Sequence, residues 1–229
     1  MGWFEAWLPY ILVPALLISV LAQVLVQLVL ARAEAAGTRL SGYAVARHIL
    51  DGAGRYGVRV EQVPGQLSDH FDARRDVLEL SGEVYHGRNV AAMAMAAHEA
   101  CHVLQNSGRG KFLIIRELAI PAATFGGGGG ILVAVVGLVL RSEPLLGVGI
   151  VLFSFAVYLQ LLNFPVELHA SLVALRRLVA LEIVDRDQRP VVRRALLAVA
   201  LTYVGATLQS VLTLIQRVAF LVNRPRDGS

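Results

Sequence analysis

The sequence predicts a mainly α-helical membrane protein with three to four transmembrane helices and a small α+β region. Of its 229 residues, 56% are hydrophobic, and the mean hydropathy is +0.61, which is more apolar than an ordinary soluble domain. Several apolar runs are long enough to cross a bilayer. The largest polar region between them contains the sequence HEACH, residues 98–102, which has the spacing of a metal site.

Four apolar runs are candidates for membrane-spanning helices. The first three cover about 8–31, 118–140 and 144–164. The fourth, about 195–222, is interrupted by four polar residues, namely Thr202, Gln209, Gln216 and Arg217. We therefore expect three spans, and a fourth segment that either crosses the membrane or covers the site as a partly embedded helix.

The first run is expected to be a retained anchor and not a cleaved signal peptide. The sequence ARA at 31–33 resembles a cleavage site. However, no positive charge precedes the run, and the run is longer than a typical signal core. The chain then divides into an anchor (1–31), a polar region (32–117), a transmembrane hairpin (118–164) and a C-terminal segment (165–229).

The polar region 32–117 is predicted to contain two helices and two short strands. Ser41 is a suitable N-cap for a first helix, which the sequence DGAG at 51–54 would end. Apolar and polar side chains alternate in the first part of 58–63, and 77–80 is mostly apolar. These two segments predict a β-hairpin or ribbon with a long connection. The second strand, VLEL, could offer its edge to an extended peptide. A helix from about 87 to 106 then carries HEACH.

A run of five glycines, 126–130, lies within the second apolar run. In a membrane helix, glycine permits either close helix packing or a local break. We favour close packing.

The motif HEACH favours a metal site over incidental polar residues. On a helix His98 and His102 lie on one face, so both imidazoles can bind one ion. Glu99 lies beside that face and can accept a proton from a zinc-activated water. The preceding residues are apolar, and burying His98 and Glu99 there without a partner would be costly.

A catalytic zinc needs a third protein ligand, for which the residues alone leave several candidates. The candidates are His48, His70, His86, Glu167 and His169, with Asp69 and Asp72 less favoured. The segment 163–178 is the most informative, because Pro165 can begin a helix. Glu167 and Ser171 would then lie one turn apart, so Ser171 or His169 could orient a ligand at Glu167.

Several segments resemble the YugP-like neutral zinc metallopeptidases, a family of bacterial membrane proteins. They are SGYAVARHIL, VPGQLSDHFD, LSGEVYHGRNVAAMAMAAHEACHVLQ, FPVELHAS and ALTYVGA, which together extend from Ser41 to Ala206. The resemblance implies a zincin-like region at 32–117, zinc at His98 and His102, Glu99 as the catalytic base and Glu167 as the third ligand.

Two residues depart from the expected family pattern. The segment ELHAS resembles the E-x-x-A-D segment of membrane gluzincin peptidases, with Ser171 in place of aspartate. Cys101, the single cysteine, stands where the family would have glycine. Cys101 can fill a packing gap as a small buried apolar residue, or its thiol can modulate or compete for zinc.

The distribution of basic residues predicts on which side of the membrane the site lies. Region 32–117 has eleven Lys or Arg and 165–194 has six, whereas 141–143 has one and the N-terminal stub has none. The positive-inside rule therefore places both site-bearing segments in the cytoplasm. The formal net charge of +4 is explained by these arginines, so nucleic acid is not an expected partner.

Three further residues are candidates for a role in the site. His70 lies in a connection that could approach it, although most loop histidines are merely solvated. His169 could stabilise an oxyanion. Tyr203 could donate its hydroxyl to a tetrahedral intermediate, or bond within the helix bundle.

The favoured function is a zinc-dependent, membrane-embedded endopeptidase that acts on peptides or proteins near the cytoplasmic membrane face. The alternative is a non-catalytic zinc-binding membrane protein with a structural or metal-carriage role. A structural site needs no base such as Glu99, and a transporter is expected to carry polar residues within its spans. Membrane lipid is the other expected partner, while the sequence leaves the oligomeric state open.

Overall fold

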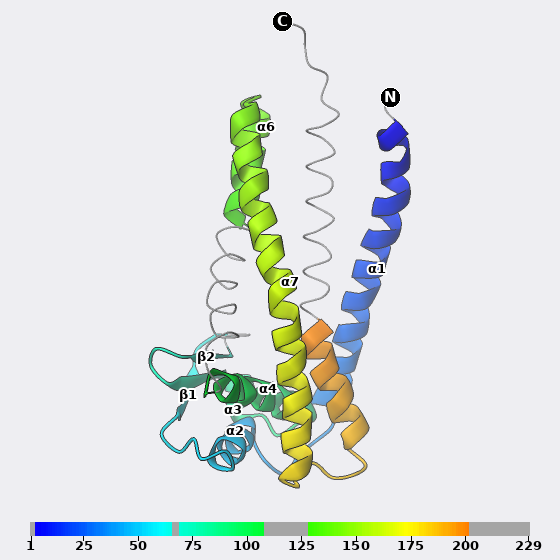
Figure 1. Cartoon of the computed structure of the whole chain (residues 1–229). Helices are drawn as coiled ribbons and strands as arrows, with labels where there is room; N and C mark the ends of the chain where they lie inside the picture. Colours follow the sequence, from blue (N-terminus) through cyan, green and yellow to red (C-terminus); the bar gives the residue numbers. More distant parts are fainter. Residues whose placement is uncertain (1–2, 66–68, 108–127, 202–229) are drawn as a thin grey trace, which may run out of the picture. The chain divides into compact units, whose positions relative to one another are not determined.

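The computed structural model describes residues 3–65, 69–107 and 128–201, and it is mainly helical with one small sheet (Figure 1). These residues form two compact units. The first holds residues 3–24 and 128–164, and the second holds residues 25–65, 69–107 and 165–201. Helices α1 (Trp3–Glu34) and α7 (Glu143–Ala180) each contribute to both units.

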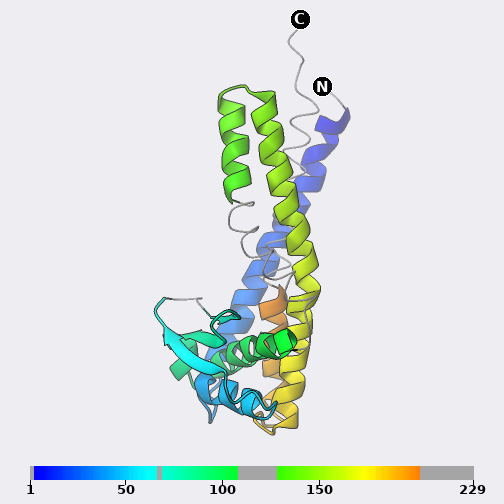
Figure 2. The ribbon, with the colours of Figure 1, turned by 60° about the vertical axis from the view of Figure 1, so that its left-hand side comes forward.

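In the first unit, α6 (Gly130–Val139) packs against the beginning of α7 (Figure 2). The two helices approach closely at glycines, since a Cβ on Gly130 would lie 2.8 Å from the Phe153 nitrogen. A Cβ on Gly137 would lie 2.4 Å from the Leu146 nitrogen. The predicted close packing is therefore found at Gly130, the last residue of the glycine run.

Among the described residues, α7 is the one helix that is long and apolar enough to cross a membrane. The predicted span at 144–164 lies within it. The prediction that Pro165 begins a new helix is wrong, because α7 continues through Pro165 to Ala180. The run at 8–31 lies within α1. The runs at 118–140 and 195–222 extend beyond the described residues, although their described parts are helical. The structure thus supports one candidate span, and an arrangement of three to four spans remains a prediction.

The second unit contains a three-stranded sheet in the order β1-β3-β2. Strand β1 (Arg59–Val63) pairs in parallel with β3 (Val77–Ser81), with Arg59 opposite Val77. Strand β2 (His70–Asp72) pairs antiparallel with β3, with His70 opposite Glu79. Because β3 is central, four of its five residues are buried.

This topology corrects the predicted hairpin of 58–63 with 77–80, because those two strands run parallel. The segment read as a long connection contains β2, and the hairpin is the β2–β3 pair. Asp72 closes its turn, since its Oδ1 accepts hydrogen bonds from the backbone N–H groups of Arg74 and Arg75 at 2.9 and 3.2 Å. The prediction that VLEL offers an edge to a peptide is also wrong, because β3 is paired on both sides.

Three helices pack around the sheet, namely α2 (Gly42–Asp51), α3 (Gly82–His86) and α4 (Val90–Ser107). Ser41 caps α2 as predicted, because its Oγ accepts from the Ala44 N–H at 3.4 Å. Helix α4 begins three residues later than predicted. Asn89 caps it instead, and its Oδ1 accepts from the Ala92 N–H at 2.8 Å.

Helix α4 forms the centre of the second unit's apolar core. It packs against α2, where a Cβ on Gly42 would lie 3.2 Å from the Ala96 Cβ, so the two helices approach closely at small residues there. The core also includes buried residues from the sheet, from α7 and from the helix at 189–201: Leu78, Leu80, Ala170, Ala174, Leu178, Ala195 and Leu196. Polar side chains on the buried part of α4 are therefore held in a rigid, dry environment.

Candidate metal centre

The second unit brings the HEACH motif of α4 against the C-terminal part of α7. His98, Glu99 and His102 come from α4, and Glu167 and Ser171 come from α7. All five side chains are buried, with Glu99 the most exposed at 5%. A group of buried ionisable residues within an apolar core is unusual, and it indicates a site and not a solvated surface.

Three donor atoms of this group converge on one point. Glu167 Oε2 lies 3.0 Å from His98 Nε2 and 3.3 Å from His102 Nε2, and the two nitrogens are 3.1 Å apart. Zinc ligands bind at about 2.0–2.2 Å, so at tetrahedral angles two donors lie about 3.3–3.5 Å apart. The observed triangle is close to that size, and its two-imidazole, one-carboxylate composition suits zinc.

Neutral side chains contact the outer nitrogen of each imidazole. His98 Nδ1 lies 3.0 Å from Ser171 Oγ, and His102 Nδ1 lies 2.9 Å from Gln105 Oε1. These contacts hold the rings so that both Nε2 atoms face Glu167. Ser171 was predicted to orient Glu167, but its hydroxyl contacts His98 instead, and Gln105 was not predicted. The i, i+3 spacing of Gln105 from His102, on a largely apolar helix, was the available signal.

The two histidines also act on the charge of Glu167, which lies just beyond the apolar run at 144–164. Burial raises the pKa of the Glu167 carboxyl, but hydrogen bonds with His102 and His98 outweigh that effect. Its pKa is consequently well below the usual range. Glu167 is thus present as a carboxylate, the form in which it can bind a cation.

Glu99 also lies near the two histidines, and these three residues form a second group that could hold a metal ion. One donor atom each of His98, Glu99 and His102 lie within 4.8 Å of one another, a looser grouping than the triangle with Glu167. A carboxylate at this distance can hydrogen-bond a water on a metal that the two histidines hold, without binding the metal itself.

The other candidates for a third ligand lie elsewhere among the described residues. His48 Nδ1 contacts the Ala44 carbonyl, and His86 Nε2 contacts Gln62 Oε1, both on exposed side chains. Asp69 and Asp72 make hydrogen bonds with Ser81 and with the β2–β3 turn, respectively. Glu167 is the candidate that the fold brings to the two motif histidines.

The remaining predicted residues have different positions. His70 is exposed on β2, with its Nε2 3.6 Å from Glu79 Oε2. His169 is also exposed, and its Nδ1 lies 3.0 Å from Gln105 Nε2. Tyr203 falls outside the described residues. Cys101 is fully buried in the apolar core, and burial raises the pKa of its thiol to about 12.

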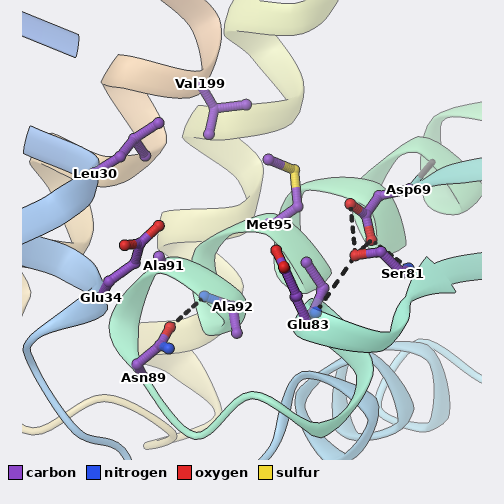
Figure 3. Close-up of a pocket in the computed structure, with 11 residues that line it drawn as sticks. Leu30, Glu34, Asp69, Ser81, Glu83, Asn89, Ala91, Ala92, Met95 and Val199 are labelled. Carbon is purple, nitrogen blue, oxygen red and sulfur yellow. Dashed lines mark hydrogen bonds between the residues drawn. The ribbon is translucent and has the colours of Figure 1, made fainter. Parts of the chain in front are cut away.

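A pocket of about 580 Å³ lies along the preceding turns of α4 (Figure 3). Met95, which lines it, is one helical turn before Glu99. Asp69 also lines it and is fixed by Ser81, whose N–H donates to Asp69 Oδ1 at 2.8 Å. The other described lining residues are Leu30, Glu34, Ser81, Glu83, Val84, Asn89, Ala91, Ala92 and Val199.

Comparison with known proteins agrees with the chemistry of this centre. A family model described as "Putative neutral zinc metallopeptidase" matches residues 8–222. The chain belongs to this zinc metallopeptidase family. A curated relative, "Putative membrane protease YugP" of Bacillus subtilis (strain 168), is 40% identical over 192 residues, which is 84% of this chain and 85% of the relative. No solved structure was found to match the chain.

Membership of the zinc metallopeptidase family confirms the resemblance inferred from the sequence and the prediction of zinc as the cofactor. The relative is named a membrane protease, and the described part of this chain has one helix able to cross a bilayer. The family also makes a peptide or protein the expected class of substrate.

Proposed function

We propose that the protein is a membrane-embedded zinc endopeptidase in which His98, His102 and Glu167 bind the metal. The observation that carries the proposal is the triangle of their donor atoms, with sides of 3.0–3.3 Å. Three protein ligands leave a fourth position open for water, as in catalytic but not in structural zinc sites. The family description supports the same chemistry.

Glu99 is the proposed general base. Zinc, when bound, supplies a Lewis acid for the scissile carbonyl and lowers the pKa of water to about 7. The Glu99 carboxylate takes a proton from the attacking water and gives it to the leaving amine nitrogen. Its 5% exposure places it in a poorly hydrated site, where a charge interacts strongly with the reacting atoms.

A substitution at Glu99 tests this mechanism. We expect Glu99→Gln to bind zinc as the wild type does, while peptide cleavage in detergent falls about 10²–10⁴-fold. Glu182→Gln is the control, because Glu182 is an exposed glutamate of the same unit. Equal cleavage by Glu99→Gln and wild type would refute the base assignment. Zinc binding without cleavage by the wild-type protein would favour the non-catalytic alternative.

We further propose that the chain is an integral protein of the bacterial cytoplasmic membrane, with three or four spans and a cytoplasmic active site. The eleven and six basic residues in 32–117 and 165–194 support this orientation. Cysteine labelling in a Cys101→Ala background tests it. In intact spheroplasts, an impermeant maleimide should label Ser142→Cys, whereas Arg186→Cys should react only after permeabilisation. The reverse pattern would show that the orientation is inverted.

A further inference from the structure

Gln105 makes three contacts that connect a proposed zinc ligand to the neighbouring helix. Its Oε1 lies 2.9 Å from His102 Nδ1. Its Nε2 lies 3.2 Å from the Val166 carbonyl oxygen and 3.0 Å from His169 Nδ1. The side chain therefore extends from α4 to the turn of α7 that contains Glu167.

The contact with Val166 determines which way the amide of Gln105 points. A backbone carbonyl can only accept a hydrogen bond, so the group facing Val166 must be the amide NH₂. The amide oxygen then faces His102 and can only accept, so His102 Nδ1 must carry a hydrogen. His102 therefore faces Glu167 Oε2 with its other nitrogen, Nε2, at 3.3 Å, and a metal bound there would replace a hydrogen on Nε2 while Nδ1 keeps its own.

We propose that Gln105 is a positioning residue, which fixes the tautomer of His102 for metal binding and ties His102 to α7 beside Glu167. This inference rests on the proposed function. The outer nitrogen of a metal-binding histidine usually donates to a carboxylate, a backbone carbonyl or water. Here an amide accepts that hydrogen, and its own NH₂ group extends the connection to α7. Gln105 thereby orients His102 and sets the distance of His102 from Glu167.

The connection explains how the triangle is held across two helices. His102 and Gln105 are on α4, whereas Val166 and Glu167 are adjacent on α7. A displacement of α4 along α7 would break the Gln105–Val166 hydrogen bond together with the approach of His102 to Glu167. His98 is held separately, through Ser171 Oγ at 3.0 Å.

Two substitutions separate the acceptor of Gln105 from its donors. Gln105→Met keeps the length of the side chain but has neither an amide oxygen nor an amide nitrogen. Gln105→Glu keeps an acceptor for His102 Nδ1 but cannot donate to Val166. A control is Gln62→Met, because Gln62 Oε1 also contacts a histidine, His86, at 2.9 Å, away from the triangle.

The experiment measures zinc affinity of the full chain in detergent, by competition with a chromophoric chelator. It also measures whether Nδ1 of His102 carries a hydrogen in the zinc-free protein, by ¹H–¹⁵N NMR of labelled histidine. We expect Gln105→Met to weaken zinc binding about 10–100-fold and to lower the fraction of His102 that carries a hydrogen on Nδ1. Gln105→Glu should keep the Nδ1–H tautomer, and Gln62→Met should match the wild type in both measurements.

Wild-type zinc affinity in Gln105→Met, with an unchanged tautomer, would overturn the inference while leaving the proposed function intact. Failure of the wild-type protein to bind zinc would instead overturn the proposed function. If Gln105→Met does not fold, the His102 NMR signal of Gln105→Glu tests whether the acceptor at position 105 holds the hydrogen on His102 Nδ1. Loss of the Nδ1–H tautomer in that variant would show that the acceptor does not control His102.

Discussion

Ser171 Oγ lies 3.0 Å from His98 Nδ1, although the two residues are 73 positions apart in the chain. Both are buried, Ser171 to 1% and His98 to 0% exposure. The contact joins α7 to the HEACH helix at the point where the gluzincin pattern would have an aspartate. A hydroxyl orients the imidazole as an aspartate would, but it adds no negative charge beside it.

Removing this hydroxyl should weaken the metal site. We expect Ser171→Ala to reduce zinc affinity about 10–100-fold, because His98 loses the partner of its outer nitrogen. Ser171→Asp should bind zinc at least as tightly as the wild type, since a carboxylate makes the imidazole a stronger ligand. Ser154→Ala is the control on the same helix, where the hydroxyl bonds only to the Ile150 carbonyl among its described contacts. Chelator competition measures the affinities, and equal values for Ser171→Ala and Ser154→Ala would contradict this role.

Asp69 should make stability depend on pH in a direction opposite to that of an ordinary surface carboxylate. Burial raises the pKa of Asp69 above 3.8, although hydrogen bonds from Ser81 oppose the shift. Its contribution to the free energy of unfolding is therefore present below pH 3.8 and is lost as the pH rises through the folded-state pKa. Asp69→Asn keeps an acceptor for Ser81 but cannot ionise. Relative to the wild type, it should become more stable as the pH rises above 3.8.

Asp72 provides the matched comparison for Asp69. Desolvation, which would raise the pKa of Asp72, is outweighed by hydrogen bonds from the Arg75 and Arg74 backbone N–H groups, so the pKa is lowered. Its contribution is present above pH 3.8 and is lost as the pH falls. Chemical unfolding in detergent at a series of pH values measures the free energy of unfolding of each variant minus that of the wild type. As the pH rises, this difference should fall for Asp72→Asn and rise for Asp69→Asn. The same sign for both would contradict the assignment.

Gly149 should be intolerant of even one methyl group. A Cβ at this position would lie 2.4 Å from the Ala134 nitrogen and 2.7 Å from its Cα, so the backbones of α6 and α7 would have to separate. We expect Gly149→Ala to lower the free energy of unfolding by about 1–3 kcal/mol. Gly147→Ala is the control two residues earlier, because nothing lies within 4 Å of its Cβ position. Thermal unfolding in detergent would contradict close packing if both variants gave the same midpoint.

Cys101 should be unreactive in the folded protein. Its side chain is fully buried, and burial raises the pKa of the thiol to about 12, so it is neither accessible nor ionised near neutral pH. A maleimide should modify it only after denaturation, whereas the exposed Arg186→Cys should react at once in detergent. Rapid modification of Cys101 in the folded protein would contradict its role as a packing residue.

The parts of the fold that could be predicted from sequence depend on short-range patterns. Ser41 caps helix α2 as expected, because a capping hydroxyl acts on a backbone N–H three residues away. The sheet could not be predicted in the same way. The pairing of β1 with β3 and the insertion of β2 depend on contacts between residues far apart in the chain, and His70 therefore lies on a strand and not in a loop.

The candidate site likewise has features that short-range patterns predict and features that depend on long-range contacts. The sequence by itself determined that His98 and His102 share a face, because residues four apart on a helix are neighbours whatever surrounds them. It also nominated Glu167, with other residues as alternatives. Only the tertiary structure decided that Glu167 Oε2 meets both imidazoles and that Gln105 connects His102 to Val166. These contacts join α4 to α7 through residues that are 61 to 69 positions apart in the chain. The packing of the two helices follows from the complementarity of their whole surfaces, which no local pattern contains.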